Sequence, residues 1–196
     1  MARTVGVLAL QGDFAAHARA LGEGGFAARP VRAAADLDGL DGLVLPGGES
    51  TTQLRLLERH GLSGPLRDFV ATGAPVFATC AGLILAATAV ERPAQPSFGF
   101  LDVVVARNAW GRQLDSFEAT ADDGATPLVF IRAPRILRVG PAAEVLVTFG
   151  GEPVMVRQGR VFGATFHPEL AGPEVHRRVF GDGAASATSS SAATPR

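Results

Sequence analysis

The alternation of short apolar segments with helical patterns in the first half of the chain is the feature that most restricts its fold. Apolar segments at 4–10 (TVGVLAL), 42–48 (GLVLPGG) and 74–80 (APVFATC) are each followed by a stretch typical of a helix. A strand that is apolar along its whole length needs cover on both faces, and parallel sheets obtain that cover from the helices between their strands. The sequence therefore predicts an α/β fold in which a mostly parallel, twisted sheet carries helices on both faces.

The second half changes character, because short strand patterns follow one another with few helices between them. Over the whole chain, helices are predicted at 13–22, 50–61, 64–73, 81–90 and 173–180. Further strands are predicted at 101–107, 115–120, 127–133, 143–150, 152–159 and 160–168. We interpret these as antiparallel strands added to the parallel core, with the chain returning to the main sheet at 160–168.

Length and composition limit the domain organisation and the possible partners. The chain has 196 residues, a formal net charge of -1 and one cysteine. This length suits a single domain, which we place at 1–180, while residues 181–196 lack the apolar groups that would offset their ordering entropy and are expected to form a disordered tail. No basic excess favours nucleic acid, and no apolar run is long enough to span a membrane. Without a secretory pattern or a second cysteine, we expect a cytoplasmic protein.

Cys80 lies at the junction of a predicted strand and a predicted helix. In parallel sheets, ligands bind beyond the carboxyl ends of the strands, which is where Cys80 is expected. The pattern of small residue, cysteine, small residue and glycine (Ala78, Cys80, Ala81, Gly82) is that of a nucleophile elbow. The following helix start would favour the thiolate. A buried, inert cysteine is the alternative on this local pattern alone.

A thiolate nucleophile needs a base, and the segment TFHPEL offers one together with its orienting group. His167 and Glu169 stand two residues apart, and residues so spaced in an extended segment point to the same side. His167 is therefore predicted to face the sulfur, with Glu169 holding the imidazole from behind. The other histidines, His17, His60 and His176, lie in helical patterns and are expected to be polar surface residues. Since one cysteine and scattered histidines have no metal-ligand spacing, no metal site is predicted.

The segment PGGES supplies a third element, a sharp turn after a predicted strand. Its Gly48 amide would point into the same crevice, where with the Ala81 amide it would form an oxyanion hole. A glycine-rich turn also occurs in phosphate-binding loops, but no Gly-Lys-Ser/Thr follows here.

These elements occur in motifs that resemble the class I (triad) glutamine amidotransferases, and most closely the glutaminase subunits of pyridoxal 5'-phosphate synthase. The matching segments span most of the chain and include GVLALQGDFAAH, PGGESTT, ATCAGLILAA, RNAWGRQLDSFE, FIRAP and FHPEL. The resemblance implies a flavodoxin-like α/β fold and hydrolysis of L-glutamine to L-glutamate and ammonia, without a cofactor. It further implies that ammonia passes to a separate synthase subunit in a hetero-oligomer, which makes pyridoxal 5'-phosphate.

The resemblance also assigns roles to individual residues. Cys80 matches the family's nucleophile, His167 its general base and acid, and Glu169 the residue that orients the histidine. The residues that match its substrate contacts are Gly48, Glu49, Ser50, Arg107, Ile131 and Arg132. Gln11, expected at the end of the first strand, matches a residue near the oxyanion hole that responds to docking of the synthase.

Three other functions remain open at this stage. The chain could serve an imidazole glycerol phosphate synthase instead, although the RNAWGRQLDSFE and FIRAP segments argue against this. A non-catalytic regulatory partner of the same fold would not need Cys80, His167 and Glu169 together. A cysteine peptidase of similar architecture is disfavoured because PGGES and HPE occur in the same chain.

Overall fold

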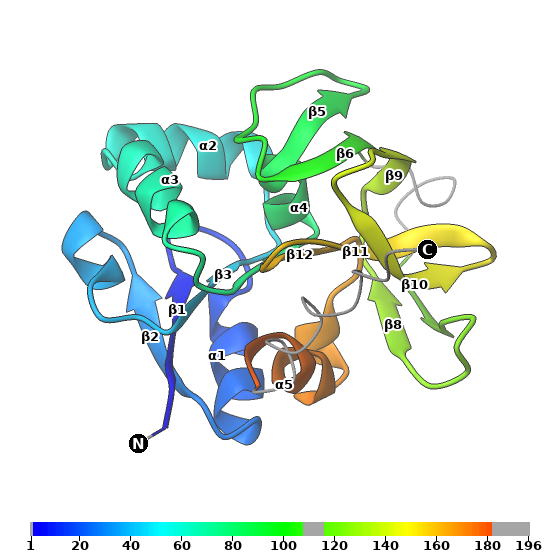
Figure 1. The fold of residues 1–196 in the computed structure, drawn as a ribbon, viewed down its shortest axis with the longest axis horizontal. Helices are drawn as coiled ribbons and strands as arrows, with labels where there is room; N and C mark the ends of the chain where they lie inside the picture. Colours follow the sequence, from blue (N-terminus) through cyan, green and yellow to red (C-terminus); the bar gives the residue numbers. More distant parts are fainter. Residues whose placement is uncertain (1, 108–115, 182–196) are drawn as a thin grey trace, which may run out of the picture.

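The computed structural model describes residues 2–107 and 116–181, and its centre is a seven-stranded sheet (Figure 1). The strand order is β10-β11-β12-β4-β3-β1-β2. Five neighbouring strands are parallel, and β10 and β11 continue the sheet in antiparallel pairing at one edge. The bounds are β1 (Thr4–Leu8), β2 (Ala27–Val31), β3 (Gly42–Leu45), β4 (Val76–Thr79), β10 (Glu144–Phe149), β11 (Glu152–Gln158) and β12 (Val161–Ala164). The predicted mostly parallel α/β fold with added antiparallel strands is confirmed.

Helices cover both faces of this sheet, as Figure 1 shows. One face carries α2 (Ser50–Arg59), α3 (Ser63–Ala71) and α4 (Ala81–Ala86), and the other carries α1 (Phe14–Glu23) and α5 (Glu174–Phe180). Strand β3 shows why its sequence is apolar throughout. Leu43 and Leu45 pack into the core under α2 to α4, whereas Val44 between them packs into the core under α1 and α5. Alternate side chains of one strand thus feed two separate cores.

Two smaller sheets flank the main one. The first contains β5 (Ala87–Glu91), β6 (Leu101–Ala106) and β9 (Arg135–Val139), and the second contains β7 (Phe117–Thr120) and β8 (Pro127–Phe130). The pairing of β6 differs from the prediction. It is antiparallel to β9 but parallel to β5, so the second half of the chain is not purely antiparallel.

The predicted helix at 81–90 is wrong in its second half, because the helix ends at Ala86 and β5 begins at Ala87. The alternating small and β-branched residues of this segment are compatible with a helix or a strand, and pairing with β6 selects the strand. The hydroxyl of Thr88 donates to the carbonyl of Leu101 across this pair.

Two further strands and two short 3₁₀ helices of the structure lie outside the predicted elements. Among the described residues, strand β2 pairs only with β1, and this edge position explains how a strand contains Pro30 and mostly exposed residues. Strand β9 is the other one. The 3₁₀ helices are η1 (Ala34–Leu37) and η2 (Pro168–Leu170).

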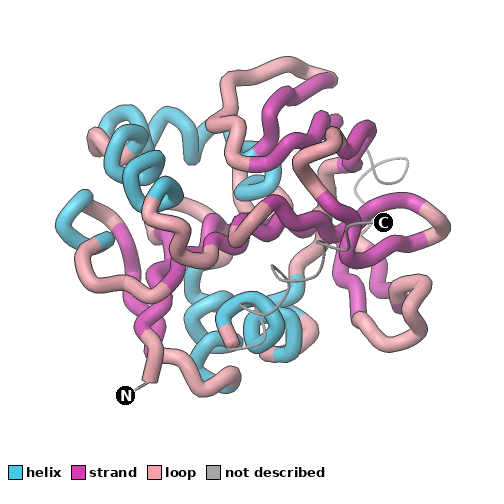
Figure 2. The backbone as a smooth tube through the Cα atoms, viewed as in Figure 1, coloured by secondary structure: helices cyan, strands magenta, loops and turns pink. Residues whose placement is uncertain are grey.

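The parallel strands of the main sheet all end at the same edge, and Figure 2 shows these strands running between the two helical layers. The segments at this edge are those that follow β1, β3, β4 and β12. They contain Gln11, the Pro-Gly-Gly turn, Cys80 and His167, so the fold brings the predicted motifs to one place.

The predicted tail falls almost entirely outside the described residues, since 182–196 are not among them. Within the described part of the chain, every helix is too short or too polar to cross a membrane.

Candidate active site

Cys80 occupies a strained elbow between β4 and α4. Its φ is 47° and its ψ is -103°, a backbone conformation that residues other than glycine rarely adopt. The peptide N–H of Cys80 donates to the carbonyl of Ala164 at 2.9 Å, which fixes the elbow to β12. Gly82 allows the close approach of α4 to β3, because a Cβ there would overlap the carbonyl oxygen of Leu45. The predicted nucleophile-elbow geometry is therefore present.

His167 and Glu169 follow β12 and form a short hydrogen bond. His167 Nδ1 lies 2.7 Å from Glu169 Oε1, and both residues are buried. The segment is not extended as predicted, because Pro168 opens the 3₁₀ helix η2. This turn, rather than strand alternation, folds the carboxylate back onto the imidazole. The peptide N–H of His167 also donates to the carbonyl of Val129 at 2.8 Å, which fixes the backbone of the residue.

The surroundings of His167 favour its cationic form. Burial is the strongest single influence and lowers the pKa of His167, but its interactions with the nearby Cys80 and Glu169 together raise it to about 10. In the static structure the thiol donates a long, weak hydrogen bond of 3.9 Å to the carbonyl of Ile131. Nε2 of His167 is buried and has no hydrogen-bond partner among the described residues. Because Nδ1 is taken by Glu169, Nε2 is the ring nitrogen left for further contacts.

The Pro-Gly-Gly turn is held by side chains and backbone from its surroundings. The carbonyl of Gly47 accepts from the Asp13 N–H at 3.3 Å and lies 3.4 Å from the amide nitrogen of Gln53. In a trans peptide the C=O and the following N–H point in opposite directions. The Gly48 N–H therefore points away from Asp13 and Gln53, whose contacts hold the orientation of this peptide. Its predicted role as an oxyanion donor with the N–H of Ala81, the first residue of α4, stays a prediction.

Gln11 lies against this turn, although β1 ends at Leu8 and not at Gln11 as predicted. The Glu49 N–H donates to Gln11 Oε1 at 2.9 Å. A Cβ on Gly48 would lie 2.6 Å from the same oxygen, and the φ of Gly48 is +148°, so glycine is needed here. Gln11 thus holds the backbone of the turn from outside the pocket.

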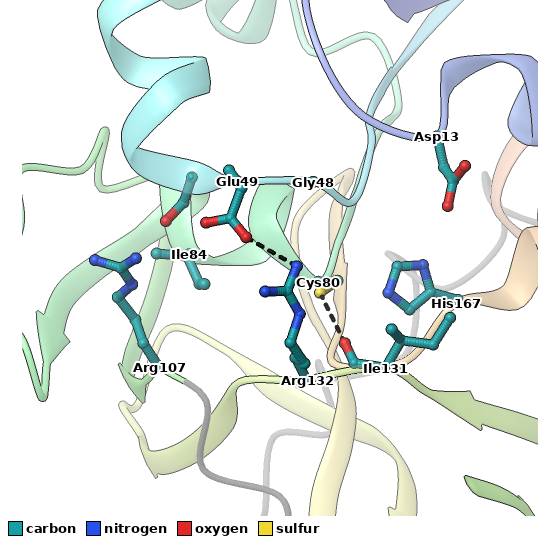
Figure 3. Close-up of a pocket in the computed structure, with 10 residues that line it drawn as sticks. Asp13, Gly48, Glu49, Cys80, Ile84, Arg107, Ile131, Arg132 and His167 are labelled. Carbon is teal, nitrogen blue, oxygen red and sulfur yellow. Dashed lines mark hydrogen bonds and ion pairs between the residues drawn. The ribbon is translucent and has the colours of Figure 1, made fainter. Parts of the chain in front are cut away.

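These elements surround an open pocket of about 130 Å³, drawn in Figure 3. Cys80 and His167 both line it. So does every residue that the resemblance assigned to substrate contact, namely Gly48, Glu49, Ser50, Arg107, Ile131 and Arg132. Two further lining residues, Asp13 and Ile84, were not predicted. Their positions in the sequence could have predicted this. Asp13 lies between β1 and α1, at the edge of the sheet where the pocket forms, and Ile84 lies one helical turn after Cys80.

Charges of both signs face this pocket. Arg132 Nη2 and Glu49 Oε1 form an ion pair at 2.9 Å, and about half of each side chain is exposed, 58% for Arg132 and 49% for Glu49. Arg107 reaches the pocket from the other side of Glu49 (Figure 3). A ligand with its own ammonium and carboxylate, such as an amino acid, would find a partner for each group.

One group of potential metal ligands lies within the described residues, formed by Asp13, His167 and Glu169 with ligand atoms within 4.8 Å of one another. Nδ1 of His167 is hydrogen-bonded to Glu169, and Asp13 is exposed. The group is therefore explained by the hydrogen bond between His167 and Glu169 and gives no reason to place an ion there.

The prediction that His17 and His176 are surface residues is wrong, because both are fully buried, whereas His60 is exposed as predicted. Their helical spacing predicts the burial that the structure shows. His17 shares a helix face with Ala20 and Leu21, three and four residues later, and those residues are buried. His176 shares its face with Val179 and Phe180 in the same way.

Comparisons with known proteins found relatives over most of the chain. The model of the SNO glutamine amidotransferase family matches residues 7–180. A protein of Deinococcus radiodurans named pyridoxal 5'-phosphate synthase subunit PdxT is 53% identical over 186 residues, which cover 90% of this chain and 95% of that protein. A protein of the same name from Geobacillus thermodenitrificans is 48% identical over 90% of this chain and 92% of its own length.

Solved structures extend the comparison. A crystal structure of a glutamine amidotransferase superposes with a TM-score of 0.83 at 46% identity, covering 89% of this chain and 96% of that one. The structure of PurLQS from Thermotoga maritima contains a chain of the same fold, with a TM-score of 0.65 at 17% identity over 91% of this chain and 98% of its own. With the family model matched over nearly the whole described chain and relatives about half identical, the chain belongs to the SNO glutamine amidotransferase family.

Proposed function

We propose that this chain is the glutaminase subunit of a pyridoxal 5'-phosphate synthase, which hydrolyses L-glutamine to L-glutamate and ammonia and passes the ammonia to a synthase subunit. The observation that carries the proposal is the pocket itself. It joins a thiol on a strained elbow, an imidazole held by a carboxylate, and side chains of both charges. Relatives about half identical over most of the chain bear the name of that synthase's subunit, which supports this choice of pathway.

In the first half of the reaction, the Cys80 thiolate attacks the side-chain amide carbon of glutamine. The carbonyl oxygen becomes an oxyanion that the N–H groups of Gly48 and Ala81 stabilise, each worth about 3 kcal/mol in comparable sites. The imidazolium of His167 then gives its Nε2 proton to the departing nitrogen. The C–N bond breaks, ammonia leaves, and a γ-glutamyl thioester remains on Cys80.

In the second half, water attacks the thioester. His167, now neutral, takes a proton from the water, and the C–S bond breaks to release glutamate and restore the thiolate–imidazolium pair. Glu169 holds the ring through Nδ1 in both halves and stabilises the imidazolium when it forms. The raised pKa of His167 suits the first half, which starts from the protonated ring.

Substrate binding uses the charged side chains at the pocket. Glu49 would pair with the α-ammonium of glutamine, and Arg107 or Arg132 with its α-carboxylate. Ser50 and the backbone of Ile131 would contact the substrate between the charged end and the sulfur. Gln11, which touches the backbone at Gly48 and Glu49, is the residue through which docking of the synthase would adjust the oxyanion turn.

The partner is thus a synthase subunit in a hetero-oligomer, and neither nucleic acid nor a membrane is part of the proposal. We place the catalytic domain at residues 1–180 and the complex in the cytoplasm. Residues 181–196 are proposed as a tail outside the domain.

Ammonia release from glutamine, measured with and without the pyridoxal 5'-phosphate synthase subunit, tests the proposal. We expect low activity for the chain by itself and a marked rise once that partner is added. A rise only with the synthase subunit that makes imidazole glycerol phosphate would favour that pathway instead, and equal rates with and without either partner would contradict the coupling.

Cys80→Ala separates an enzyme from a regulatory partner of the same fold. The substitution should lower ammonia release by about 10⁴-fold or more, because the nucleophile is gone, while the variant still folds and binds the synthase. An electrophilic glutamine analogue should add to the wild-type chain and not to the variant. Full turnover by the variant would refute the nucleophile assignment.

A further inference from the structure

A pair of buried histidines, His17 and His176, lies next to the proposed catalytic residues His167 and Glu169. His17 comes from α1 and His176 from α5, 159 residues apart, and both are fully buried. The two helices contact each other on the same face of the sheet, and α1 also contacts η2, which carries Glu169. Two fully buried imidazoles with no role in the proposed chemistry need an explanation, because burying polar groups costs free energy unless they are paired.

The contacts of His17 lead straight to the catalytic carboxylate. Its Nδ1 lies 2.9 Å from His176 Nε2, and its Nε2 lies 3.1 Å from Thr79 Oγ1 and 3.3 Å from Glu169 Oε2. The other oxygen of Glu169 holds His167. A continuous chain of polar contacts therefore runs from His176 through His17 and Glu169 to His167.

Glu169 needs a donor at its second oxygen. The side chain is fully buried, and Oε2 has no well-aligned hydrogen bond among the described residues. His17 Nε2 at 3.3 Å therefore stands where a donor is needed, with Thr79 Oγ1 sharing its direction. A buried carboxylate oxygen without a donor loses its hydration with nothing in exchange, which costs folding free energy.

These contacts select one tautomer of His17. A proton on Nε2 puts an N–H on the side of the ring that faces Thr79 Oγ1 and Glu169 Oε2, with the better-aligned contact to Thr79, whereas a lone pair there would face the carboxylate's own lone pairs and repel them. Nδ1 of His17 then accepts the hydrogen bond from the Nε2–H of His176. Of the four nitrogens of these two rings, the unprotonated Nδ1 of His176 is then the one without a hydrogen bond among the described residues.

Both rings are kept neutral. Burial is the main cause that lowers the pKa of His17 well below its usual value, with the charges of His176 and His167 adding to it, and burial lowers the pKa of His176 to about 4. Neutrality matters, because a cationic His17 would compete with His167 for the charge of Glu169. A neutral donor steadies the carboxylate and leaves its charge to the imidazolium of His167.

We infer that His17 is a positioning residue for the proposed glutaminase reaction, a neutral imidazole that holds the second oxygen of Glu169 so that the first stays aimed at His167, with His176 fixing its tautomer. This inference rests on the proposed function, since it concerns the same catalytic residues.

The test compares H17Q with H17M, each as the complete chain in complex with the synthase subunit. Glutamine and methionine are close in length and volume, but only glutamine offers an N–H to Glu169. We expect H17M to lower kcat about 10–100-fold with KM for glutamine within twofold, and H17Q to recover most of the loss. Equal kcat for the two folded variants, or a kcat of H17M within threefold of the wild type, would overturn the inference.

A second measurement on the wild-type chain does not depend on how the variants fold. Nitrogen NMR of imidazole-labelled protein at neutral pH should show a ring, absent from H17Q, with its proton on Nε2 and none on Nδ1. A proton on Nδ1 alone, or on both nitrogens, would overturn the inference. If the wild-type complex releases no ammonia, the proposed function is wrong. If the wild-type complex is active and H17M has the same kcat, only the proposed role of His17 is wrong.

Discussion

Replacement of Gly47 by alanine is the sharpest test of the site's geometry, because one methyl group would meet the imidazole of His167, the proposed general base and acid. A Cβ at this position would lie 2.5 Å from Cε1 and 3.1 Å from Nδ1 of His167, and 3.5 Å from Cβ of Cys80. Gly47 is not among the residues with positive φ, so alanine fits its backbone. The contact with Cys80 is an ordinary one, so the imidazole alone must move.

The displacement follows from contact distances. Carbon atoms rest about 3.5–4.0 Å apart, so the ring of His167 must shift by about 1 Å to clear the methyl group. Its 2.7 Å hydrogen bond to Glu169 cannot stretch that far and must bend or break. A misplacement of about 1 Å in a catalytic group typically costs about 100-fold in rate.

We therefore expect G47A to lower kcat for glutamine hydrolysis about 100-fold in the complex with the synthase subunit. Its KM should change little, because Glu49 and the pocket arginines keep their places. The control is G22A, whose added Cβ meets nothing within 4 Å in α1 and which should keep full activity. A folded G47A, judged by its urea unfolding curve, with kcat within threefold of the wild type would refute the assigned geometry.

Two further predictions concern stability, and urea unfolding checks both. The free energy of unfolding of G82A should be lower by about 3 kcal/mol or more, because its Cβ would overlap the backbone oxygen of Leu45. The control G64A lies in α3 with nothing within 4 Å of its added Cβ, so its stability should be unchanged or higher by up to about 1 kcal/mol. Equal stability of the two variants would contradict the close approach of α4 to β3 at Gly82. On acidification, the unfolded chain protonates His176 near pH 6.5 while the folded chain resists until about pH 4. Stability therefore falls as the pH falls across this window, by about 1.6 kcal/mol between pH 6.5 and 5. H176F should lose that part of the pH dependence, and an identical pH slope for variant and wild type would contradict a buried neutral His176.

The sequence predicted most of the main sheet and the meeting of the catalytic motifs for a physical reason. Parallel strands deliver their carboxyl ends to one edge, so residues just after such strands converge whatever their separation in the chain. Cys80, the Pro-Gly-Gly turn and His167 all follow apolar strand patterns. The 3₁₀ turn that returns Glu169 to His167 could not be predicted in this way, because strand alternation gives the wrong local geometry for the right contact.

The buried histidines were missed because a polar residue in a helical pattern was assigned to the surface by its type and not by its position. Periodicity places His17 and His176 on the apolar faces of α1 and α5. Strand β2 was missed for the opposite reason, since its edge position lets it carry exposed residues and Pro30. In both cases tertiary packing outweighs local composition.

Cys80 and His167 are held by the sheet, whereas Glu49 and Arg132 lie in loops, and we expect different kinetic roles for the two pairs. Thr79 and Ala164 are paired in the register of β4 and β12, so the sheet fixes the sulfur one residue beyond this pair and the imidazole three residues beyond it. Glu49 and Arg132 instead come from loops and are about half exposed, so their ion pair can open when a substrate supplies its own charges. Changes that disturb packing around the sheet ends should therefore act on kcat, whereas changes in the two loops should act on KM. The proposed proton transfer needs a fixed distance between the imidazole and the sulfur, which the strands provide. Substrate entry needs an ion pair that can open, which the loops provide.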